Sequence, residues 1–207
     1  MTQPRLDVLV VVDDDPAVHN VIRLAMGERG SSVLSYYDSS AFIEDLANIP
    51  PAVVLLDLVM PGRDGLSVQK EIVRSGLPLS VVFLSGAGQL PDAVEAMRHG
   101  AVDFLGKPFR RDALYAALAR AETNLAQLAT ERDRRNRLQV LSRLSPREVE
   151  VLQAIAAGLQ TKTIAYQLDI SCRTVEMHRG NITTKLGAPL TGALLLAQEA
   201  GLLKTAA

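Results

Sequence analysis

Residues 53–62 read VVLLDLVMPG, and the first half of the chain is organised around this segment. Its four consecutive apolar residues, two of them β-branched, predict a parallel strand that is buried on both faces. The Pro61-Gly62 pair predicts a turn, because proline fixes one backbone dihedral and glycine tolerates the others. Asp57 therefore lies at the carboxyl end of a buried strand, where open α/β sheets bind their ligands. A carboxylate in such a place is costly unless it is paired, bound to a metal or used chemically.

Further apolar runs alternate with helical patterns on both sides of this strand. The other predicted strands are residues 6–12, 32–36, 79–84 and 102–105. Apolar residues at helical spacing predict helices from residue 16 to Gly27, over 39–47, 66–74 and 92–99, and from Arg110 onward. Five strands that alternate with five helices predict an α/β domain with a doubly wound, five-stranded parallel sheet.

Polar residues lie at or just past the ends of four of the predicted strands. They are Asp13 and Asp14, Asp57, Ser85 and Lys107. The carboxyl ends of parallel strands open on one edge of the sheet, so we expect these side chains to converge. Three converging carboxylates repel one another unless a hard divalent cation lies among them, and Mg²⁺ prefers oxygen ligands. With a lysine to offset charge and a serine hydroxyl to donate, the set suits phosphoryl transfer to a carboxylate.

The last third of the chain has helical patterns only. Ser145-Pro146-Arg147-Glu148 predicts a capping box at the start of a helix that ends at Gly158. The remaining helices are predicted over residues 161–168, from a cap at Ser171 to Leu186, and over 190–203. A tight corner joins the second of these helices to the third, which is the helix-turn-helix arrangement.

The segment between the two domains contains neither Pro nor Gly from residue 110 to 141, which favours one continuous helix. Its leucines at 114, 118, 125 and 128 fall on one helical face. We expect Leu114 and Leu118 to pack on the sheet, whereas Leu125 and Leu128 either extend that face or pair with a second subunit.

Composition narrows the classes of function. Of the 207 residues, 48% are hydrophobic, which suffices for packed cores and argues against disorder. No apolar run approaches the roughly 20 residues that span a bilayer and no secretory signal is visible, so we expect a cytoplasmic protein without membrane contact. The single cysteine, Cys172, excludes an internal disulfide. Residues 1–121 hold 11 basic and 15 acidic residues, whereas residues 142–207 hold 7 basic and 5 acidic residues. This difference in charge indicates that the two parts of the chain have different partners.

In its motifs, the span 5–121 resembles the receiver domain of response regulators. The matching features are Asp13-Asp14 after a valine-rich strand, Asp57 followed by Met60-Pro61-Gly62, Ser85, and Lys107-Pro108-Phe109. The resemblance implies a flavodoxin-like receiver fold with Asp57 as the phosphoacceptor. By the same likeness we expect the Lys107–Pro108 peptide bond to be cis.

The same likeness assigns roles around Asp57. It implies that Mg²⁺ is bound directly by Asp14, mainly through water by Asp13, and also by Asp57 and the backbone carbonyl of Val59. It further implies that Ser85 and Lys107 bind the phosphoryl oxygens. Phe104 falls where the family has an aromatic switch residue, which would respond together with Ser85.

Residues 142–204 resemble the LuxR-type four-helix DNA-binding domain. Leu144-Ser145-Pro146-Arg147-Glu148, Lys162-Thr163-Ile164-Ala165 and Arg173-Thr174-Val175-Glu176 carry much of the match. The resemblance implies that the third helix enters the major groove of double-stranded DNA. Base contacts are then expected from Arg173, Glu176, Met177 and Gly180, and phosphate contacts from Lys162, Thr163, Thr174, Arg179, Asn181 and Lys185. A helical module that binds protein is the alternative for this domain.

The pairing of the two modules resembles response regulators of the FixJ and NarL kind, with domains at 1–121 and 142–207 joined by a linker helix at 122–141. It implies a phosphorylation-dependent transcriptional regulator of a two-component system. A sensor histidine kinase would phosphorylate Asp57, and a homodimer would then bind promoter DNA and contact RNA polymerase. A phosphate sink or adaptor that does not need DNA remains as the alternative. We expect no turnover enzyme, because Val59 stands two positions after Asp57, where a hydrolase would need a general acid.

Overall fold

The computed structural model describes residues 7–27, 29–86 and 90–203, without the side chains of residues 90–93. The chain divides into two compact units, Met1–Arg132 and Asp133–Ala207. One helix, α5 (Arg111–Leu141), runs through this division without a break, so the expected continuous helix is confirmed. The domain boundaries expected at residues 121 and 141 stay a prediction.

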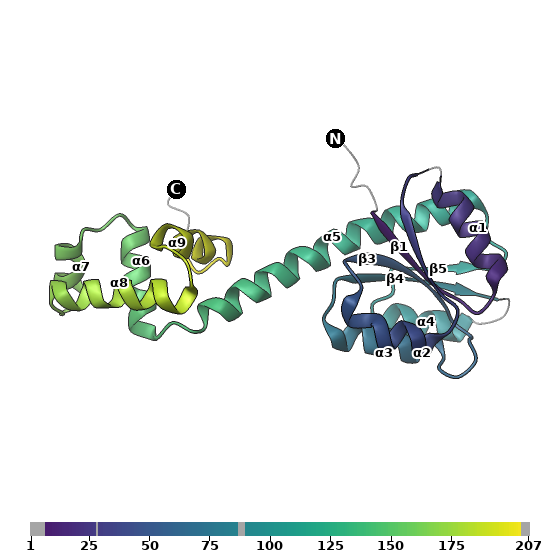
Figure 1. Ribbon diagram of the computed structural model, residues 1–207, viewed down its shortest axis with the longest axis horizontal. Helices are drawn as coiled ribbons and strands as arrows, with labels where there is room; N and C mark the ends of the chain where they lie inside the picture. The colour runs from purple at the N-terminus through teal and green to yellow at the C-terminus, as the bar shows by residue number, and fades with distance from the viewer. Residues whose placement is uncertain (1–6, 28, 87–89, 204–207) are drawn as a thin grey trace. The chain divides into compact units, whose positions relative to one another are not determined.

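The first unit is built on a five-stranded parallel sheet with strand order β2-β1-β3-β4-β5 (Figure 1). The strands are β1 (Val8–Val12), β2 (Ser32–Tyr36), β3 (Ala52–Asp57), β4 (Leu79–Ser85) and β5 (Asp103–Gly106). In the register of the sheet, Val12 pairs with Leu56, Asp57 with Leu84, and Ser85 with Gly106. The carboxyl ends of β1, β3, β4 and β5 therefore lie along one edge of the sheet.

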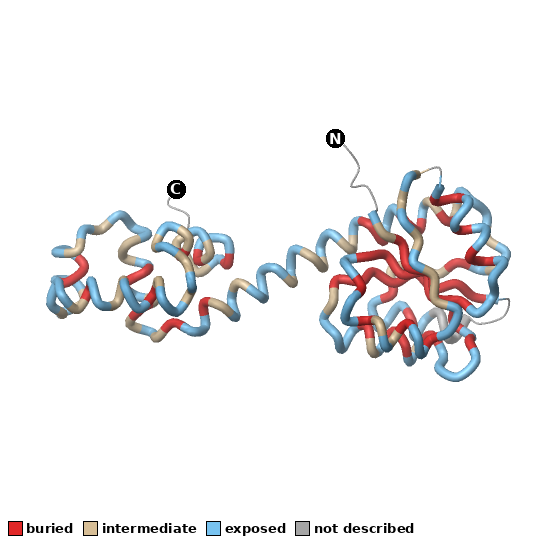
Figure 2. The backbone as a smooth tube through the Cα atoms, in the orientation of Figure 1, coloured by how far each residue is buried: buried red, intermediate tan, exposed pale blue. Residues whose placement is uncertain are grey.

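Helices cover both faces of this sheet, which confirms the doubly wound fold. They are α1 (Pro16–Gly27), α2 (Ser39–Asp45) with the 3-10 turn η1 (Leu46–Asn48), α3 (Gly65–Ser75), α4 (Leu90–Arg98) and α5. Because alternate strand residues face opposite sides, two apolar cores form. Val54, Leu56 and Phe83 belong to the core with α2, α3 and α4, and Val53 and Leu55 to the core with α1 and α5. Figure 2 shows this buried layer running along the strands.

Aspartate side chains cap the first turns of α1 and α3, the helices that follow β1 and β3 along the chain. The Asp15 carboxylate accepts a hydrogen bond from the Ala17 N–H at 2.8 Å, as expected of a capping residue. Asp64 caps α3 in the same way, through the Ser67 N–H at 2.7 Å. Both caps satisfy backbone donors that have no partner within the helix.

The second unit contains α6 (Pro146–Ala156), α7 (Thr161–Gln167), α8 (Cys172–Leu186) and α9 (Leu190–Glu199) around one apolar core. The predicted capping box at Ser145 and Glu148 is confirmed. In the corner between α7 and α8, Asp169 has a φ of 51°, a left-handed conformation that aspartate tolerates better than most residues.

The last helix is shorter than the predicted span 190–203. It ends at Glu199, and Gly201 then takes a left-handed φ of 75°. The Leu202 N–H bonds back to the Ala197 carbonyl at 2.9 Å, and Leu202 and Leu203 still pack against the core. The apolar pattern therefore continued past the end of the helix because these leucines are half-buried without being helical.

Candidate functional site

Three carboxylates meet at the carboxyl edge of the sheet, as expected. Asp13 and Asp14 follow β1, Asp57 ends β3, and each of the three offers an oxygen within 4.8 Å of the others. Asp13 and Asp57 are buried, whereas Asp14 is exposed to solvent. Two buried carboxylates and one open one form a cluster that could hold a divalent metal ion, with an exposed side from which the ion can enter.

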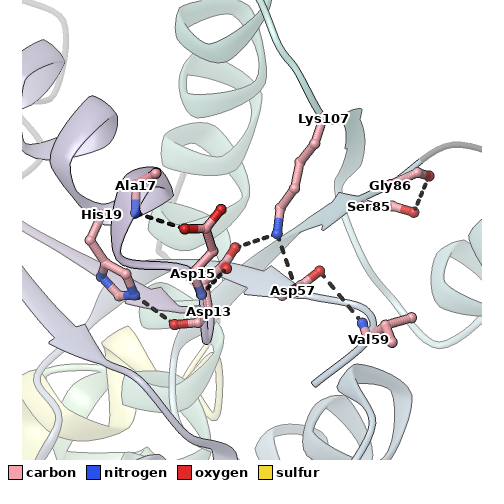
Figure 3. A network of polar contacts seen from close by, with 9 residues as sticks. All are labelled: Asp13, Asp15, Ala17, His19, Asp57, Val59, Ser85, Gly86 and Lys107. Carbon is pink, nitrogen blue, oxygen red and sulfur yellow. Dashed lines mark hydrogen bonds and ion pairs between the residues drawn. The ribbon is translucent and has the colours of Figure 1, made fainter. Parts of the chain in front are cut away.

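Lys107 reaches into this cluster from the segment after β5 (Figure 3). Its Nζ lies 2.6 Å from Asp13 Oδ2 and 3.1 Å from Asp57 Oδ2. Three carboxylates and one ammonium leave an excess of two negative charges, which a divalent cation would balance. The donor set and its charge therefore fit Mg²⁺, which favours carboxylate oxygens and retained waters.

Burial and charge act in opposite directions on the ionisation of this pair. Burial raises the pKa of the Asp57 carboxyl above its ordinary value; the Lys107 ammonium opposes this shift and the Asp13 carboxylate adds to it. Burial alone would lower the pKa of Lys107, but its contacts with Asp13 and Asp57 raise it. Lys107 is therefore held as a cation, and that cation offsets part of the rise that burial causes in the pKa of Asp57.

Gly65 sets how closely α3 approaches the end of β3. A β-carbon at this position would lie 2.3 Å from the Asp57 carbonyl oxygen, so any side chain here would clash with the backbone. The Gly65 N–H donates to the Leu58 carbonyl at 2.9 Å, which ties the start of α3 to the loop after Asp57. The sequence pattern did not identify this glycine, because its role depends on which helix packs on which strand end.

Ser85 and Phe104 lie on the two strands next to the cluster. Ser85 is buried at the end of β4; its hydroxyl donates to the Gly86 carbonyl at 3.0 Å, and its own carbonyl accepts from the Lys107 N–H at 2.6 Å. Phe104 is half-buried in β5 and packs on the core with α2, α3 and α4. The expected cis bond between Lys107 and Pro108 is confirmed. The phosphoryl-binding role of Ser85 and the switch role of Phe104 stay predictions.

In the second unit, α8 has one packed side and one open side. Val175 and Ile182 are fully buried in the core. The open side carries the residues expected to face bases, which are all exposed: Arg173, Glu176, Met177 and Gly180. Among the residues expected to contact phosphates, Lys162, Thr163 and Asn181 are exposed and Thr174 is half-buried.

Three charged residues of α8 have partners within the domain, and Glu176 on the open side is one of them. Glu176 accepts from the Thr161 hydroxyl at 2.9 Å and lies 3.4 Å from Arg179, so the start of α7 is tied to α8. The Lys185 ammonium lies 2.6 Å from the buried Glu148 carboxylate, which joins α8 to α6. The contacts of Arg179 and Lys185 with phosphate stay predictions, and these ion pairs argue for structural roles.

The Glu148 carboxylate accepts hydrogen bonds from the Ser145 N–H at 2.7 Å and from the Lys185 ammonium at 2.6 Å. Burial alone would raise the pKa of its carboxyl, but the hydrogen bonds from Lys185 and Ser145 hold the pKa below its ordinary value. Glu148 is thus ionised at neutral pH, and it fixes both the start of α6 and the last turn of α8.

His19 is a buried residue beside the acidic cluster that no sequence pattern identified. It lies in α1, its Nε2 is 2.7 Å from the Asp13 carbonyl oxygen, and it is fully buried (Figure 3). A single histidine in an apolar helical pattern is ordinarily core, and only the packing of α1 beside the end of β1 brings it to the acidic cluster.

Comparison with known proteins assigns both units. Residues 9–119 match the response regulator receiver domain, and residues 142–193 match the bacterial regulatory proteins of the LuxR family. The chain belongs to the response regulators. The transcriptional regulatory protein FixJ of Bradyrhizobium diazoefficiens is 38% identical over 200 residues, which cover 94% of this chain and 96% of FixJ.

Solved structures of response regulators agree with this assignment over nearly the whole chain. The response regulator StyR is 32% identical with a TM-score of 0.69, and the match covers 94% of this chain and 99% of StyR. Full-length FixJ from B. japonicum is 35% identical with a TM-score of 0.55, over 96% of this chain and 98% of FixJ.

This response regulator is a phosphorylation-dependent transcription regulator with a LuxR-type DNA-binding domain. Its two domains indicate a histidine kinase and DNA as partners, and the family consists typically of transcription factors that are not enzymes. Among the described residues, no helix is both long and apolar enough to span a membrane.

Proposed function

We propose that Asp57 is the residue that accepts the phosphoryl group and that Mg²⁺ is the cation of the acidic cluster. One observation carries this proposal: the Asp57 carboxylate lies within reach of two other carboxylates and 3.1 Å from the Lys107 ammonium. A buried carboxylate in such surroundings has an unbalanced charge that favours a cation and then an incoming phosphoryl group.

The residues present suit the cation. Asp13, Asp14 and Asp57 supply carboxylate oxygens, and the Val59 backbone carbonyl follows in the loop after β3. A bound Mg²⁺ would neutralise charge on the transferring phosphoryl oxygens. Asp57 is oriented by the Val59 N–H, which donates to its Oδ1 at 3.5 Å.

In the transfer, an Asp57 oxygen forms a bond to phosphorus while the bond from phosphorus to the donor histidine nitrogen breaks. The Lys107 ammonium contacts the Asp57 Oδ2 atom. It can therefore pass from the carboxylate to an oxygen of the phosphoryl group that binds there. The Ser85 hydroxyl would turn from the Gly86 carbonyl to a second phosphoryl oxygen. Phosphorylation thus pulls Ser85, which ends β4, and Lys107, which follows β5, toward β3.

The response would spread through β5. Phe104 is half-buried on this strand and can move further inward when Ser85 turns toward the phosphoryl group. We propose that the receiver then forms a homodimer, that two α8 helices bind two half-sites in promoter DNA, and that the complex contacts RNA polymerase in the cytoplasm. Base contacts would come from the exposed side of α8, with Arg173 as the principal hydrogen-bond donor.

A gel-shift assay and light scattering test this account together. Acetyl phosphate and Mg²⁺ should convert the protein to a dimer and tighten its binding to promoter fragments, and Asp57→Asn should abolish both effects. Dimer formation that survives Asp57→Asn would contradict the assignment of Asp57. Phosphorylation without any DNA binding would favour the adaptor instead.

A further inference from the structure

Asp13 is held through all of its polar groups. Its N–H donates to the Tyr36 carbonyl at 3.1 Å, and its Oδ1 accepts from the Asp15 N–H at 3.0 Å. Its Oδ2 pairs with Lys107, and its carbonyl oxygen lies 2.7 Å from His19 Nε2. The chain therefore leaves β1 in a fixed direction, and Asp14 is the next residue in that direction.

The His19 ring is bound to this backbone in a defined manner. A carbonyl oxygen only accepts, so the hydrogen bond to Asp13 requires a proton on Nε2. The other ring nitrogen, Nδ1, is buried and has no hydrogen-bond partner among the described residues. An unpaired buried polar atom costs free energy, so an apolar residue would pack here more favourably. What the imidazole adds over such a residue is its hydrogen bond to Asp13.

Tyr37 holds the ring from its other side. The centroids of the His19 and Tyr37 rings lie 4.3 Å apart, with an angle of 37° between their planes. Tyr37 follows β2 directly, and β2 is paired with β1, so the ring lies between α1 and the strand end that it contacts. The imidazole is thus fixed by one aromatic contact and one hydrogen bond.

We propose that His19 is a positioning residue for the cation site. By holding the Asp13 carbonyl, it sets the direction in which Asp14 presents its carboxylate to the cation. Asp14 is exposed, so burial does not fix its side chain and its place depends on the backbone before it. The inference rests on the proposed Mg²⁺ site, and partners that orient metal ligands generally affect metal affinity strongly.

Two variants separate the hydrogen bond from the aromatic contact. His19→Phe keeps a ring beside Tyr37 and removes the donor, whereas His19→Gln removes the ring and keeps an N–H donor at a similar reach. Mg²⁺ affinity of the full chain is measured without any phosphodonor, by titration of amide NMR shifts. The rate of Asp57 phosphorylation by acetyl phosphate is then measured as a function of Mg²⁺ concentration.

We expect His19→Phe to weaken Mg²⁺ binding about tenfold. Its phosphorylation rate at saturating Mg²⁺ should stay close to that of the wild type, and His19→Gln should bind Mg²⁺ nearly as the wild type does. Equal affinity of His19→Phe and wild type, or equal losses in both variants, would overturn the role of His19. Should His19→Phe fail to fold, His19→Leu is the donor-free variant. A wild-type protein that neither binds Mg²⁺ nor gains a phosphoryl group would overturn the proposed function itself.

Discussion

Replacement of Lys107 by methionine is the most informative perturbation of the acidic cluster. Methionine keeps much of the length and apolar volume of lysine but removes the charge that lies 2.6 Å from Asp13 and 3.1 Å from Asp57. Without it, two buried carboxylates face each other with no compensating cation. The variant therefore measures how much the resting site depends on the ammonium.

The size of the effect follows from burial. Removal of one partner from a buried ion pair costs about 3–5 kcal/mol. The Lys107 side chain is 22% exposed, and solvent screens part of the interaction, so we expect a loss of about 2–3 kcal/mol in the free energy of unfolding. The matched control is Lys70→Met, because Lys70 pairs with Glu95 at 3.6 Å on the surface, where a pair is worth about 0–1 kcal/mol.

The loss should depend on pH and on Mg²⁺ in a defined direction. Burial already raises the pKa of Asp57, and without Lys107 that pKa rises further. A raised pKa in the folded state is a penalty at neutral pH that disappears as the pH falls through that pKa, so the deficit should shrink as the pH is lowered. Saturating Mg²⁺ supplies positive charge to the same carboxylates and should restore most of the stability.

Urea unfolding of the full chain is monitored by pulsed hydrogen exchange and mass spectrometry. Peptides of β3 then report the unfolding of the first unit separately from peptides of α8, which report that of the second. The measurement is made with EDTA at neutral pH, with EDTA in acid, and with Mg²⁺. Equal stability of Lys107→Met and wild type in EDTA would show that the ammonium does not stabilise the buried carboxylates. So would a loss that neither acid nor Mg²⁺ reduces.

Three further changes test the second unit. Glu148→Gln should lower its free energy of unfolding by about 1–3 kcal/mol, because Lys185 loses its ionised partner; unchanged urea unfolding would contradict that role. Arg173→Ala should reduce discrimination between operator variants by about 1–3 kcal/mol in competitive gel shifts. Lys162→Ala should instead weaken binding to every sequence and reduce the salt-dependence slope by about 1. Sequence-specific losses for Lys162→Ala, or uniform ones for Arg173→Ala, would show the two roles to be wrongly assigned.

The convergence of Asp13, Asp57 and Lys107 could be predicted because each lies at or just past the end of an apolar run that predicts a strand. A parallel sheet brings such strand ends together whatever the details of packing. His19 and Gly65 could not be predicted in this way. Their roles depend on how α1 and α3 lie against particular strand ends, and no local pattern records that.

The same limit applies to the second unit. A basic residue on the recognition helix, such as Lys185, suggests a phosphate contact, and only the fold brings it to Glu148, 37 positions earlier in the chain. Helix starts were predicted well because capping boxes such as Ser145 to Glu148 are local. The end of α9 was not, because Leu202 and Leu203 continue the apolar pattern beyond the helix.

Phosphorylation of Asp57 is tested most directly by the intact mass of the protein after treatment with acetyl phosphate and Mg²⁺. We expect one labile adduct of phosphoryl mass, which peptide mapping after reductive trapping places on Asp57 and which Asp57→Asn cannot form. Absence of the adduct with several phosphodonors, or an adduct that persists in Asp57→Asn, would contradict phosphorylation of Asp57.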